Sequence, residues 1–242
     1  MFRFFALCVL LVPAVAAADA PEIVSVVVDG VRDPEWAGYR HAYRAGARFS
    51  RMISTRPLIQ AHMQIQPLRE ELSLAGIEVQ LQGEKTSMVF RADPIGRVTI
   101  PLLKQPYDED AVLRLNRQKG HYRFGGRFTI REREDGVYDA AMLRAGCEQM
   151  LSIQREAGST FILMGKQCVG VRFIYPLAQA VTLEFRAAAA APGALASAVE
   201  RPFDLPPMPG KYQVVTYRFA DWPGAGALVA ATRPLAIIAL YQ

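Results

Sequence analysis

The residues best suited to hold a ligand combine aromatic rings with arginines in one short stretch. Trp36, Tyr39 and Tyr43 recur at spacings of three and four, and Arg40 and Arg44 recur at a spacing of four. Rings stack on sugars or cations, and guanidinium groups pair with anions. The stretch is therefore a candidate clamp for an anionic or sugar ligand. The alternative is an amphipathic helix with buried rings and solvated arginines, which the different angles of the two stripes favour.

No catalytic motif accompanies this stretch. No two of His41, His62 and His121 are close enough in sequence to form a local ligand pair, and no zinc-protease, nucleophile-elbow or phosphate-loop pattern occurs. The acidic run from Asp108 to Asp110 lacks the spacing of a regular calcium loop, so we predict a solvated turn. We predict no catalytic residue, no metal site and no cofactor. A hydrolase whose site is assembled from distant residues is the alternative.

Residues 1–18 have the pattern of an export signal. A positive charge at Arg3 precedes an apolar run, which ends in the small residues Ala16 to Ala18. The apolar run is shorter than the roughly 20 residues that a membrane-spanning helix needs. We therefore expect a periplasmic or secreted protein without a transmembrane helix.

Two cysteines, Cys147 and Cys168, remain once Cys8 is removed with the signal. An even number in an exported chain favours a disulfide between them. The alternative is a pair of buried thiols, because free cysteine packs as a small apolar residue.

The composition is that of a globular protein, with 51% hydrophobic residues, 21% charged residues and a formal net charge of +5. In an exported compartment the expected partners are an envelope protein, a glycan or an anionic surface such as lipid head groups, and nucleic acid is not expected. Solubility alone is the alternative explanation of the charge. The oligomeric state stays open.

The first segment after the signal, residues 19–56, is expected to hold one strand and one helix. The strand is Ile23–Asp29, and the helix runs from Pro34 to Ala45 with Asp33 as its cap and Gly46 as its stop.

Residues 57–133 are predicted to form an antiparallel β-sandwich, because short alternating runs recur about every ten residues between turn signals. The runs are Leu58–Ile65, Ile77–Gln82, Met88–Phe90, Val98–Ile100, Ala111–Leu115 and His121–Ile130.

A turn motif within this segment carries a resemblance to a known family. Asp93, Gly96, Val98, Ile100 and Pro101 form an Asp-x-x-Gly-x-Val-x-Ile-Pro run, in which the aspartate can bond the turn backbone and the glycine permits its conformation. With the strands before it, residues 65–131 resemble the transthyretin-like sandwiches found as carboxypeptidase-regulatory modules. The resemblance implies an accessory or binding module without catalytic residues.

Residues 134–242 are expected to form an α+β segment with an Ala/Pro-rich loop at 187–211. A helix at Val137–Glu156 carries Cys147 on its apolar face. The expected strands are Phe161–Met164, Val169–Tyr175, Val181–Phe185, Tyr212–Tyr217, Ala227–Ala231 and Leu235–Tyr241.

The predicted fold class is therefore mainly β with two helices (α+β), an antiparallel sandwich followed by a disulfide-tied α+β segment. The predicted function is that of an exported, non-catalytic envelope accessory or binding protein.

Overall fold

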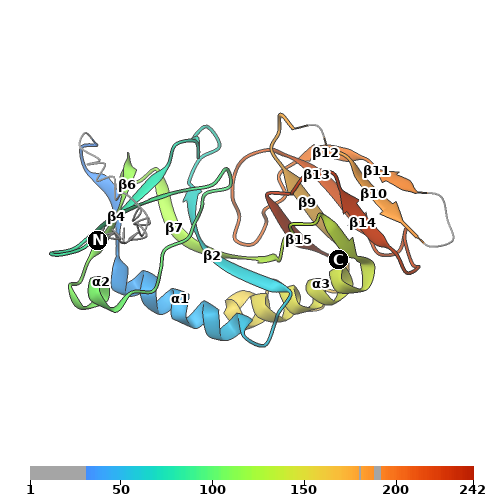
Figure 1. Ribbon diagram of the computed structural model, residues 1–242, viewed down its shortest axis with the longest axis horizontal. Coiled ribbons are helices and arrows are strands. Elements are labelled where there is room, and N and C mark those ends of the chain that lie inside the picture. The colour runs from blue at the N-terminus through green and yellow to red at the C-terminus, as the bar shows by residue number, and fades with distance from the viewer. Residues whose placement is uncertain (1–30, 180, 188–191) are drawn as a thin grey trace, which may run out of the picture.

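The computed structural model describes residues 31–179, 181–187 and 192–242, and antiparallel sheets dominate it (Figure 1). The predicted signal peptide and the predicted strand Ile23–Asp29 lie outside the described residues, as do positions 188–191 of the predicted Ala/Pro-rich loop. The predicted mainly β class with a Cys147–Cys168 disulfide is confirmed. The described chain has one helix more than the two that were predicted.

The described strands form three sheets, which we call the N-terminal, shared and C-terminal sheets. The N-terminal sheet contains, in spatial order, β1 (Pro34–Gly38), β6 (Val112–Gln118), β3 (Glu78–Gln82) and β4 (Ser87–Arg91). The shared sheet contains β12 (Ser197–Glu200), β13 (Tyr212–Arg218), β9 (Cys168–Tyr175), β15 (Ala236–Tyr241), β7 (Tyr122–Ile130), β2 (Ile59–Pro67) and β5 (Arg97–Val98). The C-terminal sheet contains β11 (Gly193–Leu195), β10 (Leu183–Arg186), β14 (Ala227–Ala230) and β8 (Val137–Asp139).

The helices lie on one side of the molecule. Figure 1 shows α1 (Tyr39–Ile53) and α3 (Ala140–Gln154) following one another along its lower side, with the short α2 (Lys104–Asp108) near the start of α1. Asp139 caps α3 by accepting hydrogen bonds from the backbone of the first turn, and a π-helical turn, η1 (Arg155–Ser159), continues α3. No helix in the described part of the chain is long and apolar enough to cross a membrane.

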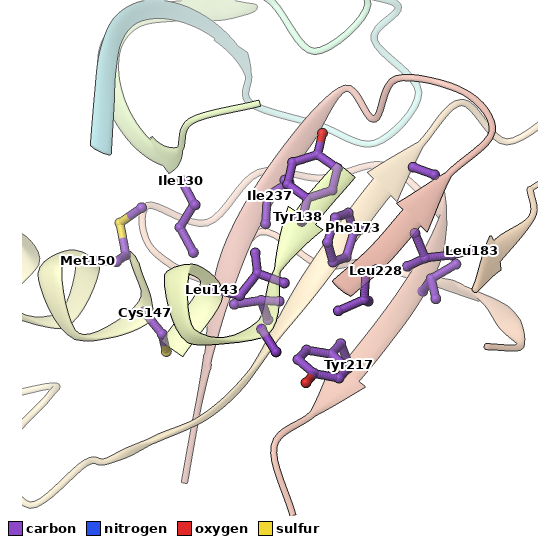
Figure 2. Close-up of a cluster of buried hydrophobic side chains, with 14 of the residues drawn as sticks. Ile130, Tyr138, Leu143, Cys147, Met150, Phe173, Leu183, Tyr217, Leu228 and Ile237 are labelled. Carbon is purple, nitrogen blue, oxygen red and sulfur yellow. The ribbon is translucent and has the colours of Figure 1, made fainter. Parts of the chain in front are cut away.

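The shared sheet joins two hydrophobic cores, because β2 and β7 contribute to both. Ile59 of β2 and Ile130 of β7 belong to the C-terminal core, which fills the space between α3, the shared sheet and the C-terminal sheet (Figure 2). Ile65 of β2 and Tyr122 of β7 belong to the N-terminal core, which packs against α1 and the N-terminal sheet. Strands on both sides of residue 133 therefore pair in one sheet.

The opposite face of the shared sheet has its own, smaller cover. Phe203 and Met208, from the proline-rich segment before β13, pack there with Ile174 of β9 and Val214 of β13. Ile95, in the turn between β4 and β5, completes this third cluster. Two irregular segments thus cover a face on which the sequence places both apolar and polar side chains.

The disulfide fastens α3 to the shared sheet. Cys147 is fully buried on α3, Cys168 begins β9, and their Cα atoms are 5.9 Å apart. In Figure 2 Cys147 lies on the side of α3 that faces the C-terminal core. The bridge is therefore a link between a helix and the strand beneath it, as the sequence predicted.

The predicted helix at Pro34–Ala45 is wrong in its first part. Pro34–Gly38 is strand β1, which pairs with β6, and the Tyr39 amide donates to the Ala111 carbonyl at 2.8 Å. Asp33 does not cap a helix but adopts a φ of 53° and accepts from the Lys119 amide. Pairing with a distant strand therefore overrides the local capping signal, and Trp36 leaves the helix.

Two further boundaries differ for reasons of packing. Gly46 lies inside α1 and does not stop it. The glycine allows Leu102 to pack against the helix, because a Cβ at this position would lie 2.8 Å from Leu102 Cδ2. The predicted strand Phe161–Met164 is a turn closed by hydrogen bonds from Leu163 to Ser159 and from Lys166 to Leu163. A short apolar run by itself does not distinguish a strand from an exposed turn.

Removing the disulfide should destabilise the fold without changing it. The bridged cysteines are 21 residues apart, and closing a loop of that size restricts the unfolded chain. We expect Cys147→Ala/Cys168→Ala to lower the free energy of unfolding by about 3 kcal/mol, measured by urea denaturation. Two thiols that can be alkylated in the native, unreduced protein would contradict the bridge.

Candidate functional site

The aromatic members of the predicted clamp separate in the structure. Tyr39 is fully buried, and its hydroxyl donates to the Pro101 carbonyl at 2.7 Å and accepts from the Leu103 amide at 2.8 Å. Burial raises the pKa of this phenol, so it stays protonated. Trp36 stands on β1 and is 53% exposed. Tyr39 is therefore a core residue that holds the segment before α2.

The remaining members of the clamp gather around Tyr107 of α2. Arg40 donates from Nε to the Tyr107 carbonyl at 2.8 Å and pairs with Asp110 at 3.3 Å, while Arg44 donates to the Tyr107 hydroxyl at 3.1 Å. Both guanidinium groups lie within 6 Å of the Tyr107 ring, at 5.5 and 5.8 Å from its centroid, and the Tyr43 ring is 4.9 Å away. These contacts join α1 to α2, so they occupy groups that a ligand would need.

The acidic residues from Asp108 to Asp110 also bond to other groups of the protein. Asp108 pairs with Lys104, Asp110 pairs with Arg40, and Glu109 accepts from the Lys85 amide at 3.1 Å. Across residues 31–179, 181–187 and 192–242, no three His, Cys, Asp or Glu side chains are grouped as a metal would require.

A polar groove between β4 and the covered face of β2 is a stronger candidate site. It encloses about 610 Å³, and its lining residues are Gln60, Ala61, His62, Val89, Phe90, Arg91, Asp93, Arg97, Thr99, Glu132 and Arg233. Most of these side chains are polar or charged. They come from β2, β4, the turn before β5, β5 and the residue after it, the segment just after β7 and the connection between β14 and β15.

The groove exists because β2 and β7 have two unlike faces. Along β2 the sequence alternates, so that Ile59 and Ile65 enter the cores while Gln60, His62 and Gln64 point to the opposite face. Thr129 and Arg127 lie beside Gln60 and His62 in the register with β7. Residues that neither core accepts are thereby collected on one surface.

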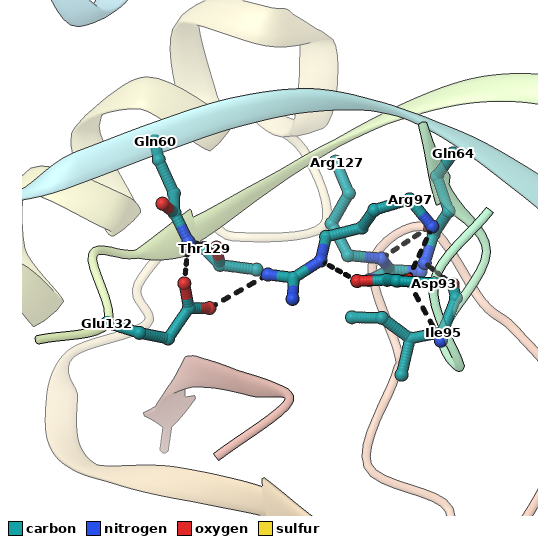
Figure 3. Close-up of polar contacts among 8 residues, drawn as sticks. All are labelled: Gln60, Gln64, Asp93, Ile95, Arg97, Arg127, Thr129 and Glu132. Carbon is teal, nitrogen blue, oxygen red and sulfur yellow. Dashed lines mark hydrogen bonds and ion pairs between the residues drawn. The ribbon is translucent and has the colours of Figure 1, made fainter. Parts of the chain in front are cut away.

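Arg97 organises one end of this polar face (Figure 3). Its guanidinium pairs with Asp93 and with Glu132, the latter at 3.0 Å, and the Glu132 side chain is only 3% exposed. Gln60 donates to Thr129 at 2.9 Å and to the second oxygen of Glu132. Glu132 is therefore a buried carboxylate whose charge Arg97 and Gln60 stabilise.

Asp93 also shapes the turn that leads into β5. One carboxylate oxygen accepts from the Ile95 amide at 3.0 Å and the Arg97 amide at 2.8 Å, as expected of this turn motif. Gly96 adopts a φ of 79°, and a Cβ there would lie 2.3 Å from the Ile65 carbonyl oxygen. The turn can therefore approach β2 only with glycine at this position.

Arg127 holds the proline-rich segment before β13 on the same face of the sheet. Its side chain is 2% exposed and has no carboxylate partner among the described residues. It donates to Gln64 at 2.7 Å and to the carbonyls of Leu205 and Pro206, with Phe203 4.4 Å from its guanidinium carbon. Burial lowers the pKa of Arg127 to about 10. Backbone carbonyls thus compensate a buried cation and fix the proline-rich segment on the sheet.

His62 lies between these two arginines with Nε2 buried and without a hydrogen-bond partner. Burial, reinforced by the charges of Arg97 and Arg127, lowers its pKa to about 3, so the imidazole is neutral near pH 7. No hydrogen bond in the described chain joins the side chain of His41, His62 or His121 to an acid, a serine or a cysteine. The groove therefore offers charge pairing and hydrogen bonding, without a paired acid and base for proton transfer.

No protein-family model, no curated protein and no solved structure matches this chain. The interpretation of the groove therefore depends on its own geometry.

The sequence contained one signal for this groove. The alternation of apolar residues with Gln60, His62 and Gln64 indicates a strand with a polar face. In an ordinary sandwich that face would be solvated, and nothing local shows that two segments more than 25 residues away along the chain bury it.

The buried ion pair between Arg97 and Glu132 can be tested by comparing three variants. Arg97→Leu leaves the buried Glu132 without its cation, so we expect it to lower the free energy of unfolding by about 3 kcal/mol. Arg97→Leu/Glu132→Leu should recover much of that loss. Arg91→Leu is the matched control, because Arg91 is 82% exposed where it pairs with Glu78, and should cost less than about 1 kcal/mol. Additive losses in the double variant, measured by urea unfolding, would argue against the pair.

His62 should make the protein sensitive to acid in a defined window. Because its pKa is lower in the folded protein than in the unfolded chain, the unfolded chain binds the extra proton between the ordinary value near 6.5 and about 3. As the pH is lowered from about 6.5 to about 3, the free energy of unfolding should therefore decrease, by at most about 1.4 kcal/mol per pH unit from this group. Above pH 6.5 His62 should add no pH dependence. His62→Gln should show a shallower loss in urea unfolding, and parallel curves would refute the assignment.

Proposed function

We propose that this protein is an exported, non-catalytic component of the cell envelope that binds an extended polypeptide segment of a partner in the groove beside β4. The export pattern in residues 1–18 supports a periplasmic or secreted location. The transthyretin-like resemblance over residues 65–131 supports an accessory role.

The observation that carries the proposal is the open edge of β4. Among the described strands β4 pairs with β3 alone, so it ends the N-terminal sheet. The Ala92 amide donates to Ile77 and the Gly83 amide donates to Thr86, which fixes which residues of β4 bond to β3. In this alternation the amide and carbonyl groups of Val89 and Arg91 point away from β3. Because both residues line the groove, an extended chain placed there can add to the sheet.

The charges of the groove favour an acidic segment. Its carboxylates, Asp93 and Glu132, are both paired with Arg97. Arg91 pairs with Glu78 through Nε at 3.2 Å but is 82% exposed, and Arg233 forms no ion pair within the described residues. Arg233 is thus available to a ligand, and Arg91 can reach one through the guanidinium nitrogens that do not contact Glu78. His62, which also lines the groove, has a buried Nε2 without a hydrogen-bond partner in the described chain.

A polypeptide fits this groove better than a glycan does. Sugar sites commonly present an aromatic face for stacking. The single aromatic residue in the lining, Phe90, packs against the N-terminal core. The hydrolase alternative has no such support, because the histidine in the groove is without an acid to orient it.

Site-specific photocrosslinking in the native envelope tests the proposal. We expect a photoreactive residue at Val89 to form an adduct with a polypeptide, whereas the same residue at Val199 should not. Val199 is the matched control because it is 53% exposed on β12, another edge strand. Equal adducts at both positions, or a glycan adduct at Val89, would contradict peptide binding here.

A proline substitution separates backbone pairing from side-chain contact. Val89→Pro removes the amide that faces the open edge. We expect it to weaken, by about tenfold or more, the binding of a synthetic peptide that has the sequence of the segment crosslinked at Val89. Val89→Ala keeps that amide and should bind within about twofold of the parent. Equal binding by the two variants, measured by titration calorimetry, would argue against strand addition.

A further inference from the structure

The turn between η1 and β9 exposes three large apolar side chains in four consecutive residues. Phe161 is 87% exposed, Met164 is 74% exposed and Ile162 is 63% exposed, the three highest values for large hydrophobic residues in the described chain. Scattered exposed hydrophobics need no explanation, but a contiguous group marks a surface that interacts with something. We call this group the apolar tip.

The apolar tip is held in place by its neighbours. Leu163, between the exposed residues, is 2% exposed and donates to the Ser159 carbonyl at 3.0 Å. Arg155 donates to the carbonyls of Leu163 and Lys166, both at 3.0 Å, and Thr160 donates to the Arg155 carbonyl at 2.8 Å. The disulfide fixes the strand that follows. The exposed side chains are therefore presented by an anchored turn.

A basic cavity lies at the base of the apolar tip. It encloses about 300 Å³, and Ile162, Leu163, Lys166 and Arg172 are among its lining residues. Nε of Arg172 is buried and has no hydrogen-bond partner. Asp204 also lines the cavity, 3.5 Å from Arg172, but its side chain is 77% exposed. Arg172 thus has donor capacity that its protein contacts leave unused.

The charge around the tip is positive. Residues 157–167 contain no acid, and the nearest one along the chain, Glu156, pairs with Arg56 at 2.8 Å. Three side chains on one turn can bury far less surface area than the roughly 800 Å² that each partner contributes to a stable protein interface. A small apolar wedge with adjacent cations is instead suited to the boundary between lipid head groups and acyl chains.

We propose that the apolar tip inserts into the surface of a membrane that contains anionic phospholipid, with a lipid phosphate bound in the cavity between Lys166 and Arg172. This membrane site is separate from the groove beside β4 and does not depend on the proposed peptide binding. It would hold the exported protein at a membrane surface while the groove stays open.

Vesicle co-sedimentation of the secreted protein, without the predicted signal at residues 1–18, tests the inference. We expect binding to vesicles of equal parts phosphatidylglycerol and phosphatidylcholine, and markedly weaker binding to phosphatidylcholine alone. Phe161→Ser/Ile162→Ser/Met164→Ser should weaken binding by about tenfold or more, because the apolar contacts are lost. Lys166→Gln/Arg172→Gln should remove the preference for anionic lipid. Failure of the unmodified protein to bind either vesicle would overturn the inference.

Two controls make the result specific to the tip. Leu177→Ser/Val199→Ser removes apolar side chains that are 50% and 53% exposed elsewhere, and it should bind as the parent does. All variants should melt within a few degrees of the parent. Phe161→Trp adds a reporter whose emission should shift to the blue on vesicles if the tip enters the lipid. A serine variant that binds normally, or a tryptophan that shows no shift, would refute insertion.

Discussion

Nine consecutive residue pairs join β2 to β7, and the two strands pass from one hydrophobic core into the other. Because side chains alternate across a sheet, placing Ile59 and Ile65 in the cores sends Gln60, His62 and Gln64 to the opposite face. Burying such groups is unfavourable unless each finds a partner. Gln64 donates to the Ile95 carbonyl in the Asp93 turn and accepts from Arg127, which the proline-rich segment holds. Gln60 donates to Thr129 and Glu132, and Nε2 of His62 is left without a partner in the described chain.

This arrangement explains why arginine occupies the centre of the structure. Arg97 joins the Asp93 turn to the end of β7, and Arg127 joins Gln64 to the carbonyls of the proline-rich segment. A guanidinium group offers five donors in a plane, so one side chain can hold several segments together. The groove is the part of this face that neither segment covers, and the proposed peptide would complete it.

The sequence predicted the features that depend on local pattern. The sandwich strands, α3 and the cysteine pair follow from alternation, helical spacing and residue counts, and the Asp93 turn follows from its own side chain. The start of α1 was wrong because β6 pairs with Pro34–Gly38, more than 70 residues away along the chain. The predicted clamp omitted Tyr107, which Arg40 and Arg44 contact, because the two helices meet only through the fold. The only local signal of the groove is the polar face of β2, and the basic cavity has none, since each site combines side chains from distant segments.

Amide hydrogen exchange at β4 tests the central claim most directly. If an extended partner adds to this edge, the amides of Val89 and Arg91, which face away from β3, should exchange much more slowly when the partner segment is bound. The amides of β12, the distant edge of the shared sheet, should not change. Unchanged exchange at Val89 and Arg91 in a saturated complex would show that the partner binds elsewhere.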